Sequence, residues 1–287
     1  MNRDVAQVSL ADALEGWRPA PVEMARRADP WFAEAFADLL DAPRPALLPP
    51  LWHWFVLLDH FAGSNTGADG HPADAPFLPP IPGRRRMFAG GRLRQDAPIP
   101  LGAELSSRAT VSDVTVKTGR SGEMAFVTVR TELFADGAPV GVEEQDIVYR
   151  SEPAGTPPRA LPPPETDRPE PEGAWRLELT TDPVLLFRFS ALTYNGHRIH
   201  YDEPYATGAE GYPGLVVHGP LLALLALELP RRHAPERAVR SVEYRLVRPA
   251  FAPARIVGAG SVQGSEAEVV VAAQGAAPSL TARVGLA

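Results

Sequence analysis

A proline-rich run near the middle of the chain constrains the fold more than any other feature of the sequence. The run SEPAGTPPRALPPPETDRPEPEG, at residues 151–173, is rich in Pro and Glu and has almost no large apolar side chains. Such a segment cannot build a hydrophobic core, and its prolines keep it extended and stiff. We therefore predict two domains, at residues 1–150 and 176–287, joined by a proline-rich linker at residues 151–175.

Both sides of the predicted linker show helix-like segments followed by strand-like segments. Residues 31–40 and 51–62 have helical apolar spacing, and residues 63–83 are a loop rich in Gly, Pro and Asp. A helix is also expected at residues 219–229, whereas residues 184–193 fit either a strand or the start of a helix. Alternating patterns predict strands at residues 104–119, 124–133, 139–150, 174–180, 240–249, 254–262, 267–274 and 279–286. This order predicts an α+β fold in which a helical region and an antiparallel sheet occur twice.

The composition argues against several kinds of chemistry. The formal net charge of −7 argues against a nucleic-acid partner, and the absence of cysteine excludes a disulfide framework and a thiolate metal site. Lys117 is the only lysine, which argues against Schiff-base catalysis and a Walker-type phosphate loop. The sequence has neither a signal-peptide pattern nor an apolar run of about 18 residues. We therefore expect a cytoplasmic protein with no membrane partner.

The stretch HGPLLALLALELP gives the clearest local prediction. Pro220 suits the first position of a helix, Pro230 marks its end, and the residues from Leu221 to Leu227 are apolar on every side. A helix of this kind is buried, and the free N–H groups at its start favour negative charge. The N–H of Gly219 could therefore stabilise an oxyanion. Alternatively, Gly219 only begins the helix and His218 is a core histidine.

A second stretch, YNGHRIHYD at residues 194–202, precedes this helix and completes a recognisable pattern. The two stretches resemble the MaoC-like, R-specific enoyl-CoA hydratases of the hot-dog fold, whose motif is Gly-Asp-x-Asn-Pro-(Leu or Ile)-His, followed by Ala-His-Gly at a helix start. His200 matches the catalytic histidine, Gly219 the oxyanion position, and Asn195 stands where the aspartate is usual. Asparagine at this place is typical of a narrower branch, the 3-methylfumaryl-CoA (mesaconyl-CoA) hydratases and mitochondrial-type 3-hydroxyacyl-thioester dehydratases.

The resemblance implies both a fold and an activity. The fold is a double hot-dog, with two antiparallel sheets each wrapped around a central helix, and the catalytic motif lies only in the C-terminal unit. The activity is reversible hydration of an α,β-unsaturated acyl-CoA. The alternatives are dehydration of 3-hydroxyacyl chains on an acyl carrier protein, thioester hydrolysis by a hot-dog thioesterase, and non-catalytic binding of acyl thioesters.

The resemblance also assigns roles to single residues. His200 is the acid–base, Asn195 holds the attacking water, and the Gly219 N–H receives the thioester oxygen. Asp202 assists catalysis, orients a histidine, or is only a turn residue. The expected substrate-binding residues are Tyr194, His197, Arg198, Tyr212 and His218, and the expected contacts to the phosphates of coenzyme A are Arg84, Arg85, Arg86 and Arg92.

No cofactor is expected beyond coenzyme A as a part of the substrate, and we expect a homo-oligomer. His53 and His60 could be read as a metal pair on one helix face, but no third ligand is in view, so no metal site is predicted.

Overall fold

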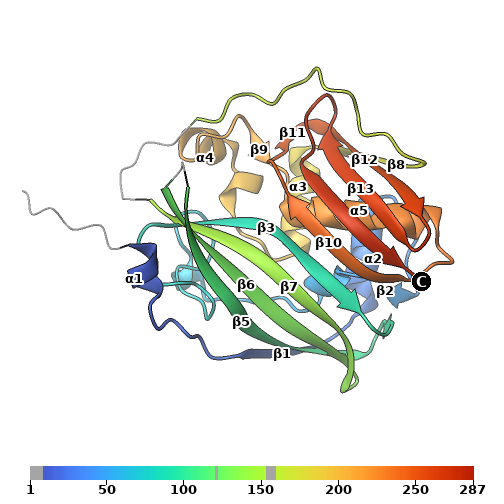
Figure 1. The fold of residues 1–287 in the computed structure, drawn as a ribbon, viewed down its shortest axis with the longest axis horizontal. Coiled ribbons are helices and arrows are strands. Elements are labelled where there is room, and N and C mark those ends of the chain that lie inside the picture. Colours follow the sequence, from blue (N-terminus) through green and yellow to red (C-terminus); the bar gives the residue numbers. More distant parts are fainter. Residues whose placement is uncertain (1–8, 120–121, 153–159) are drawn as a thin grey trace, which may run out of the picture.

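The computed structural model describes residues 9–119, 122–152 and 160–287. Within these residues, one ten-stranded sheet runs through the molecule in the order β1-β5-β6-β7-β3-β10-β14-β13-β12-β8 (Figure 1). The first five of these strands come from the N-terminal half and the last five from the C-terminal half. All neighbouring strands are antiparallel.

The strands confirm most of the sequence-based boundaries. Those of the N-terminal half are β1 (Val22–Arg27), β3 (Arg84–Gln95), β5 (Glu104–Gly119), β6 (Gly122–Ala135) and β7 (Ala138–Ser151). Those of the C-terminal half are β8 (Trp175–Thr181), β10 (Val239–Leu246), β12 (Ala254–Gln263), β13 (Glu266–Ala273) and β14 (Leu280–Leu286). Two short pairs lie outside this sheet, β2 (Leu47–Leu48) with β4 (Ile99–Pro100) and β9 (Leu215–Val216) with β11 (Phe251–Ala252).

The two halves meet at one seam in the sheet. Residues 90–94 of β3 pair with residues 241–245 of β10, so the two expected sheets are continuous with each other. The arginine-rich segment at residues 84–94 was expected only as a phosphate-binding cluster. It is instead a central strand, so the side chains of consecutive arginines point to opposite faces of the sheet.

The helix α5 (Gly219–His233) is buried through most of its length, as its apolar sequence predicts. It packs against β8, β10, β12, β13 and β14. The prediction that Pro230 ends this helix was wrong. The buried Glu228 pairs with Arg231 and Arg232, and the backbone N–H of Ala234 bonds to the Pro230 carbonyl at 2.9 Å, so the last turn continues.

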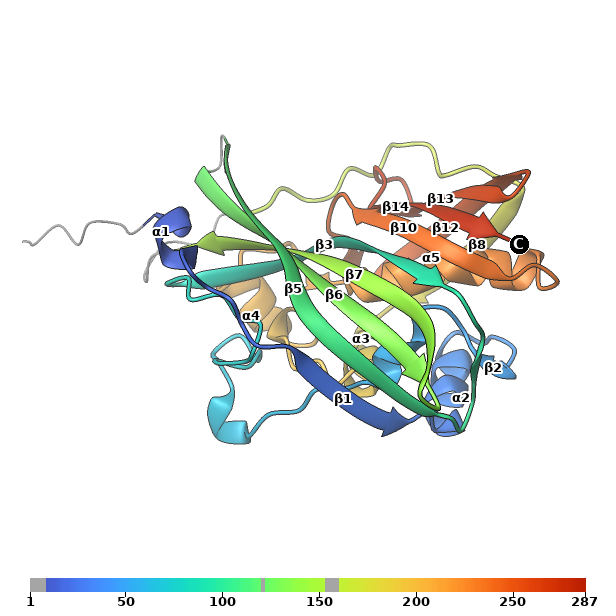
Figure 2. The same ribbon diagram turned by 60° about the horizontal axis from the view of Figure 1, so that its bottom comes forward.

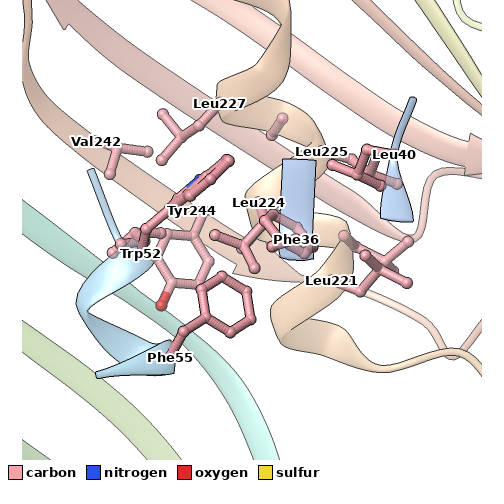
Figure 3. Close-up of a cluster of buried hydrophobic side chains, with 14 of the residues drawn as sticks. Phe36, Leu40, Trp52, Phe55, Leu221, Leu224, Leu225, Leu227, Val242 and Tyr244 are labelled. Carbon is pink, nitrogen blue, oxygen red and sulfur yellow. The ribbon is translucent and has the colours of Figure 1, made fainter. Parts of the chain in front are cut away.

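Further helices share one core with α5. The helices α2 (Pro30–Leu39) and α3 (Pro183–Leu192) lie on the same side of the curved sheet as α5 (Figure 2). Phe36 of α2, together with Trp52 and Phe55, packs beside the leucines of α5 (Figure 3). This shared core, on one face of the sheet, joins the two halves. The remaining short helices away from the site are α1 (Leu10–Leu14) and the 3₁₀ turn η2 (Gly63–Asn65).

The prediction of a helix at residues 51–62 was wrong. Only a 3₁₀ turn, η1 (Trp52–Phe55), forms there, after Leu51 in a left-handed conformation at φ 67°. His53 Nε2 lies 2.7 Å from Glu143 Oε2, and the Trp54 indole N–H donates to Glu143 Oε1 at 2.8 Å. These two bonds hold consecutive side chains on one carboxylate and stabilise the turn. His53 is thus bound to Glu143 while His60 is exposed.

The described part of the proline-rich segment, residues 160–174, has no helix or strand and runs along the C-terminal half (Figure 1). Backbone bonds join Leu161 to Gly211 and Arg168 to Gly275, and Glu170 pairs with Arg176 and Arg255. The division into two domains stays a prediction, because both halves share one sheet. Among the described residues, no helix is long and apolar enough to cross a membrane.

Candidate functional site

The segment that carries the histidine motif begins where α3 ends. Tyr194 takes the left-handed conformation at φ 49°, and the backbone N–H of Asn195 bonds to the Ser190 carbonyl at 2.8 Å. The Asn195 side-chain oxygen accepts from the backbone N–H of His197 at 3.0 Å, which is an Asx turn. Asn195 thus shapes the turn that leads into the histidines, and its amide NH₂ is the group left for other contacts.

His200 closes the short turn η3 (Arg198–His200) and is only 7% exposed. Its Nδ1 lies 2.7 Å from the Val216 carbonyl oxygen of β9. Because a carbonyl can only accept, Nδ1 carries the hydrogen and Nε2 keeps its lone pair. Burial lowers the pKa of His200 to about 4, although the Val216 bond opposes this shift and the charge of His71 adds to it. His200 is therefore a neutral base with a fixed tautomer near neutral pH.

His218 and His197 flank the ring of His200. The His218 ring is stacked on it, with centroids 3.7 Å apart, and the His197 ring stands perpendicular to it at 5.5 Å. His218 is fully buried, its Nε2 lies 2.9 Å from the Ser190 hydroxyl, and burial lowers its pKa strongly. His218 is therefore a neutral core histidine that supports His200.

Two residues of the N-terminal half complete this cluster, and the sequence analysis missed both. The His71 ring lies against that of His197, with centroids 4.0 Å apart, and the Asp69 carboxylate accepts from the backbone N–H and the Nδ1 of His71 at 3.0 Å each. The loop that carries them was visible only as a Gly- and Pro-rich segment. Its Asp-Gly-His sequence, with an Asx-turn residue two positions before a histidine, was the one available signal.

Charges within the cluster determine which rings stay neutral. Burial, with a smaller contribution from the charges of His71 and His200, lowers the pKa of His197 to about 2. Burial raises the pKa of Asp69, but the hydrogen bonds and charge of His71 outweigh this and hold it well below its usual range. Atoms of Asp69, His71 and His197 lie within 4.8 Å of one another, a spacing that a cation could bridge. Since both Asp69 oxygens already accept from His71, we interpret the trio as a hydrogen-bonded dyad beside a third ring.

Gly219 is the first residue of α5, where the helix N–H groups lack partners within the helix. A methyl group at Gly219 would lie 2.5 Å from Leu246 Cδ1 and 3.4 Å from Phe88 Cδ1. The helix start is therefore covered by two apolar side chains, one from each side of the sheet seam.

Arg198 and Asp202 are bound to each other. Two Arg198 nitrogens donate to one oxygen of Asp202 at 3.0 and 2.8 Å, and a third donates to the Ala68 carbonyl at 3.0 Å. The guanidinium also lies over the Tyr205 ring at 4.0 Å. Asp202 caps α4 (Glu203–Gly208), and the bond from Arg198 lowers its pKa. Asp202 therefore has a helix-capping role, and the guanidinium of Arg198 is already hydrogen-bonded to groups of the protein.

A cavity of about 490 Å³ opens beside the dyad. Asp69, His71 and the three arginines at 84–86 line it, with Tyr205 and Glu210 on its other side. Arg92 lies further along β3, where it pairs with Glu144 and Asp146, and does not line this cavity. The arginines predicted for coenzyme A are thus separated, three at the cavity and one away from it.

The three cavity arginines differ in their partners. Arg84 donates to the carbonyls of Pro79 and Ala73, and Arg85 pairs with Glu152 and Glu210. Arg86 is exposed and has no carboxylate partner among the described residues. Its guanidinium is therefore available to an anion in the cavity.

The two predicted tyrosines lie at the edges of the site. Tyr194 is 57% exposed beside Phe61, and Tyr212 packs against Phe251 with ring centroids 6.0 Å apart. Neither side chain is brought next to His200 by a contact in the described structure.

Comparisons with known proteins identify the family of the chain. The model of the hydroxyacyl-thioester dehydratase type 2 family matches residues 51–252. The chain is 46% identical over 223 residues to the mesaconyl-C(4)-CoA hydratase of Chloroflexus aurantiacus, covering 77% of this chain and 76% of that protein.

Solved structures show the fold. A MaoC-like dehydratase from Phytophthora capsici is similar with a TM-score of 0.67 at 12% identity, covering 96% of this chain and 97% of the other. A Mycobacterium tuberculosis protein described as having a double hot-dog fold is similar with a TM-score of 0.56 at 16% identity, covering 95% of this chain and 96% of the other. The predicted double hot-dog fold is thereby confirmed.

Proposed function

Because the chain belongs to the hydroxyacyl-thioester dehydratase type 2 family, we propose that it catalyses the reversible hydration of an α,β-unsaturated acyl-CoA to the 3-hydroxyacyl-CoA. The mesaconyl-CoA type of substrate is favoured by the 46% identity to a mesaconyl-C(4)-CoA hydratase. The observation that carries the proposal is His200, a buried neutral imidazole whose Nδ1 is held by the Val216 carbonyl and whose Nε2 is free to accept a proton.

His200 is proposed as the acid–base of the reaction. In hydration, the water oxygen bonds to the β-carbon while Nε2 of His200 takes one water proton. The π electrons move toward the thioester as an enolate, and the α-carbon then receives the proton held on Nε2, which returns His200 to its neutral form. The low pKa of His200 keeps Nε2 unprotonated over the whole neutral range, so the base is always ready for this step.

Gly219 is proposed to stabilise the negative charge that forms on the thioester oxygen. Its N–H stands at the positive end of the buried helix α5, where hydrogen bonds act in a medium of low dielectric constant. The apolar cover from Leu246 and Phe88 supports this role, because it would exclude water from the oxyanion.

Asn195 is proposed to position the water through its amide NH₂. Its side-chain oxygen is already bound to the His197 backbone, so donation is the contact that remains. An asparagine cannot carry a proton in the reaction, which leaves the acid–base role to His200.

The cavity beside the dyad is proposed to receive the phosphates of coenzyme A. Arginine suits bidentate phosphate contacts, and Arg86 is the cavity arginine whose guanidinium has no carboxylate partner among the described residues. Arg84 and Arg85 would add positive charge behind it, although their own partners hold them in place.

One assay separates the hydratase from its alternatives. The protein would be mixed with a panel of enoyl-CoA thioesters that includes mesaconyl-CoA, with an equivalent enoyl chain on an acyl carrier protein in parallel. Loss of the conjugated thioester absorbance without release of free thiol supports hydration. Release of thiol would indicate a thioesterase, and binding without either change would indicate a non-catalytic protein.

A further inference from the structure

The Asp69–His71 dyad is a titratable pair beside the base that the hydration scheme does not use. The carboxylate accepts from both the backbone N–H and the ring Nδ1 of His71, at 3.0 Å each, so the ring is fixed in one orientation. The Nε2 of His71 therefore faces away from Asp69. The ring lies against His197, which in turn stands beside His200.

Backbone contacts fix the dyad to the catalytic segment. The Arg198 N–H donates to the Asp69 carbonyl at 2.9 Å, and the Arg198 guanidinium donates to the Ala68 carbonyl at 3.0 Å. A side chain on Gly70 would lie 1.9 Å from the Gly196 carbonyl oxygen, so the two loops touch backbone to backbone. The N-terminal half thus holds His71 at a defined place next to the C-terminal histidines.

We propose that Asp69 and His71 are positioning residues for the base, and that through them the N-terminal half controls the protonation state of His200. This inference rests on the proposed hydration only for its kinetic readout. Asp69 fixes the His71 ring, the ring packs His197 against His200, and a positive charge on His71 would oppose a second charge on either neighbour. The dyad supplies electrostatic control of His200. Asn195 cannot supply it, because an amide does not ionise.

The charges around the cluster support this role. Burial is the largest cause of the lowered pKa of both His197 and His200, and the charge of His71 lowers both values as well. Arg86 lowers the pKa of His197 in the same direction, and Asp69 opposes it. The other charged or titratable groups near the cluster are His218, Arg84, Arg85, Glu152, Arg198, Asp202, Tyr205 and Glu210.

The test is the pH profile of His71→Gln and Asp69→Asn, compared with wild type. His71→Gln removes the ring that can carry a positive charge, and Asp69→Asn removes the carboxylate that favours this charge on the ring. Both variants keep similar size and a polar side chain. His200 acts as a base only when neutral, so kcat/KM falls as the pH drops through its pKa. Without the charge at His71, the pKa of His200 rises, and the acid limb of the profile should move up by on the order of one pH unit. His71→Arg, which keeps the charge, should leave this limb near its wild-type position.

His60→Gln and Asp59→Asn are the matched controls, because both residues are exposed neighbours on the same half. They should leave the profile unchanged. A second readout is independent of activity: an NMR titration of the ring protons, in which the chain's 7 histidines are few enough to assign. The His200 resonance should titrate at higher pH in His71→Gln than in wild type.

The outcomes separate the two proposals. An unchanged His200 titration in His71→Gln overturns the role of the dyad, as does a loss of rate that follows a loss of folded protein with the pH profile unmoved. Activity that EDTA removes and Zn²⁺ restores also overturns it, because the trio would then be a cation site. A wild type that hydrates no thioester, with the NMR shift as expected, refutes the proposed function and leaves the dyad's control of His200 standing.

Discussion

The rings of His200 and His218 are stacked in the core with centroids 3.7 Å apart and planes inclined by 18°. Two imidazoles at this distance cannot both be protonated without strong repulsion, and burial disfavours the charge on each. Burial lowers the pKa of each, that of His200 to about 4, and the charge of His200 lowers that of His218 as well. This pair links the chemistry of the site to the stability of the fold.

The buried histidines should make the protein acid-sensitive. In the unfolded chain a histidine has a pKa of about 6.5, so below this pH the unfolded state binds more protons than the folded one. The free energy of unfolding should therefore fall as the pH drops from 6.5, and the contribution of His200 should saturate below its folded pKa of about 4. At pH 5 this residue alone should cost roughly 2 kcal/mol.

Urea unfolding at pH 7 and pH 5 measures this effect. His200→Gln should reduce the difference between the two free energies of unfolding, whereas His60→Gln, at an exposed position, should not. Equal stability of the wild type at both pH values would show that the histidines are not buried in their neutral form.

Asn195 should tolerate a carboxylate better than truncation. Asn195→Asp keeps the acceptor for the His197 N–H, so the turn should survive, while a second ionisable group beside His200 changes the pH profile. Asn195→Ala loses the turn bond and the water contact together, and kcat/KM should fall on the order of 10²-fold through lost positioning. Rate and melting temperature are measured for both. A fully active but destabilised Asn195→Ala would restrict Asn195 to the turn.

Arg86 should affect binding of coenzyme A rather than the chemical step. One charge-assisted hydrogen bond is worth about 1.5–3 kcal/mol, so Arg86→Gln should raise KM by about tenfold or more with kcat little changed. Arg92→Gln should leave KM unchanged, because Arg92 pairs with Glu144 and Asp146 away from the cavity. The same thioesters on a short pantetheine analogue should not distinguish the variants. Equal effects from Arg86 and Arg92 would contradict the cavity as the phosphate site.

Gly219 should be intolerant of a branched side chain. The first added carbon already lies 2.5 Å from Leu246 Cδ1 and 3.4 Å from Phe88 Cδ1, so a branched side chain must push these side chains aside or shift the start of α5. Gly219→Val should therefore displace the oxyanion N–H and lower kcat on the order of 10²-fold. Gly208→Val, at a glycine with open space around it, is the control. The kcat and the melting temperature are measured for both variants, so that a loss of rate can be separated from a loss of folded protein. A wild-type kcat in Gly219→Val would exclude Gly219 from the mechanism.

Local patterns predicted the strands and the buried helix because their cause is local. Alternation along residues 104–119 gave the bounds of β5, and apolar residues on every side of α5 predicted its burial. The 51–62 segment failed because Glu143, about ninety residues away, accepts from both His53 and Trp54 and overrides their helical spacing.

The site was predictable where it follows a contiguous motif. His200 and Gly219 could be named from the sequence, since their spacing is typical of the resembled family. Asp69 and His71 could not, because their approach to His197 depends on backbone contacts between two loops more than 120 residues apart. The bond from Arg198 to the Ala68 carbonyl depends on the same contact between the two loops.

The most direct test of the whole account compares wild type with His200→Gln on mesaconyl-CoA, following the absorbance of the conjugated thioester at neutral pH. The wild type should remove this absorbance without thiol release, and His200→Gln should be slower by about 10²–10⁴-fold at a similar melting temperature. A folded His200→Gln that works within a few-fold of the wild-type rate would contradict the assignment of His200 as the base. A wild type that leaves every enoyl-CoA of the panel unchanged would contradict the proposed hydration itself.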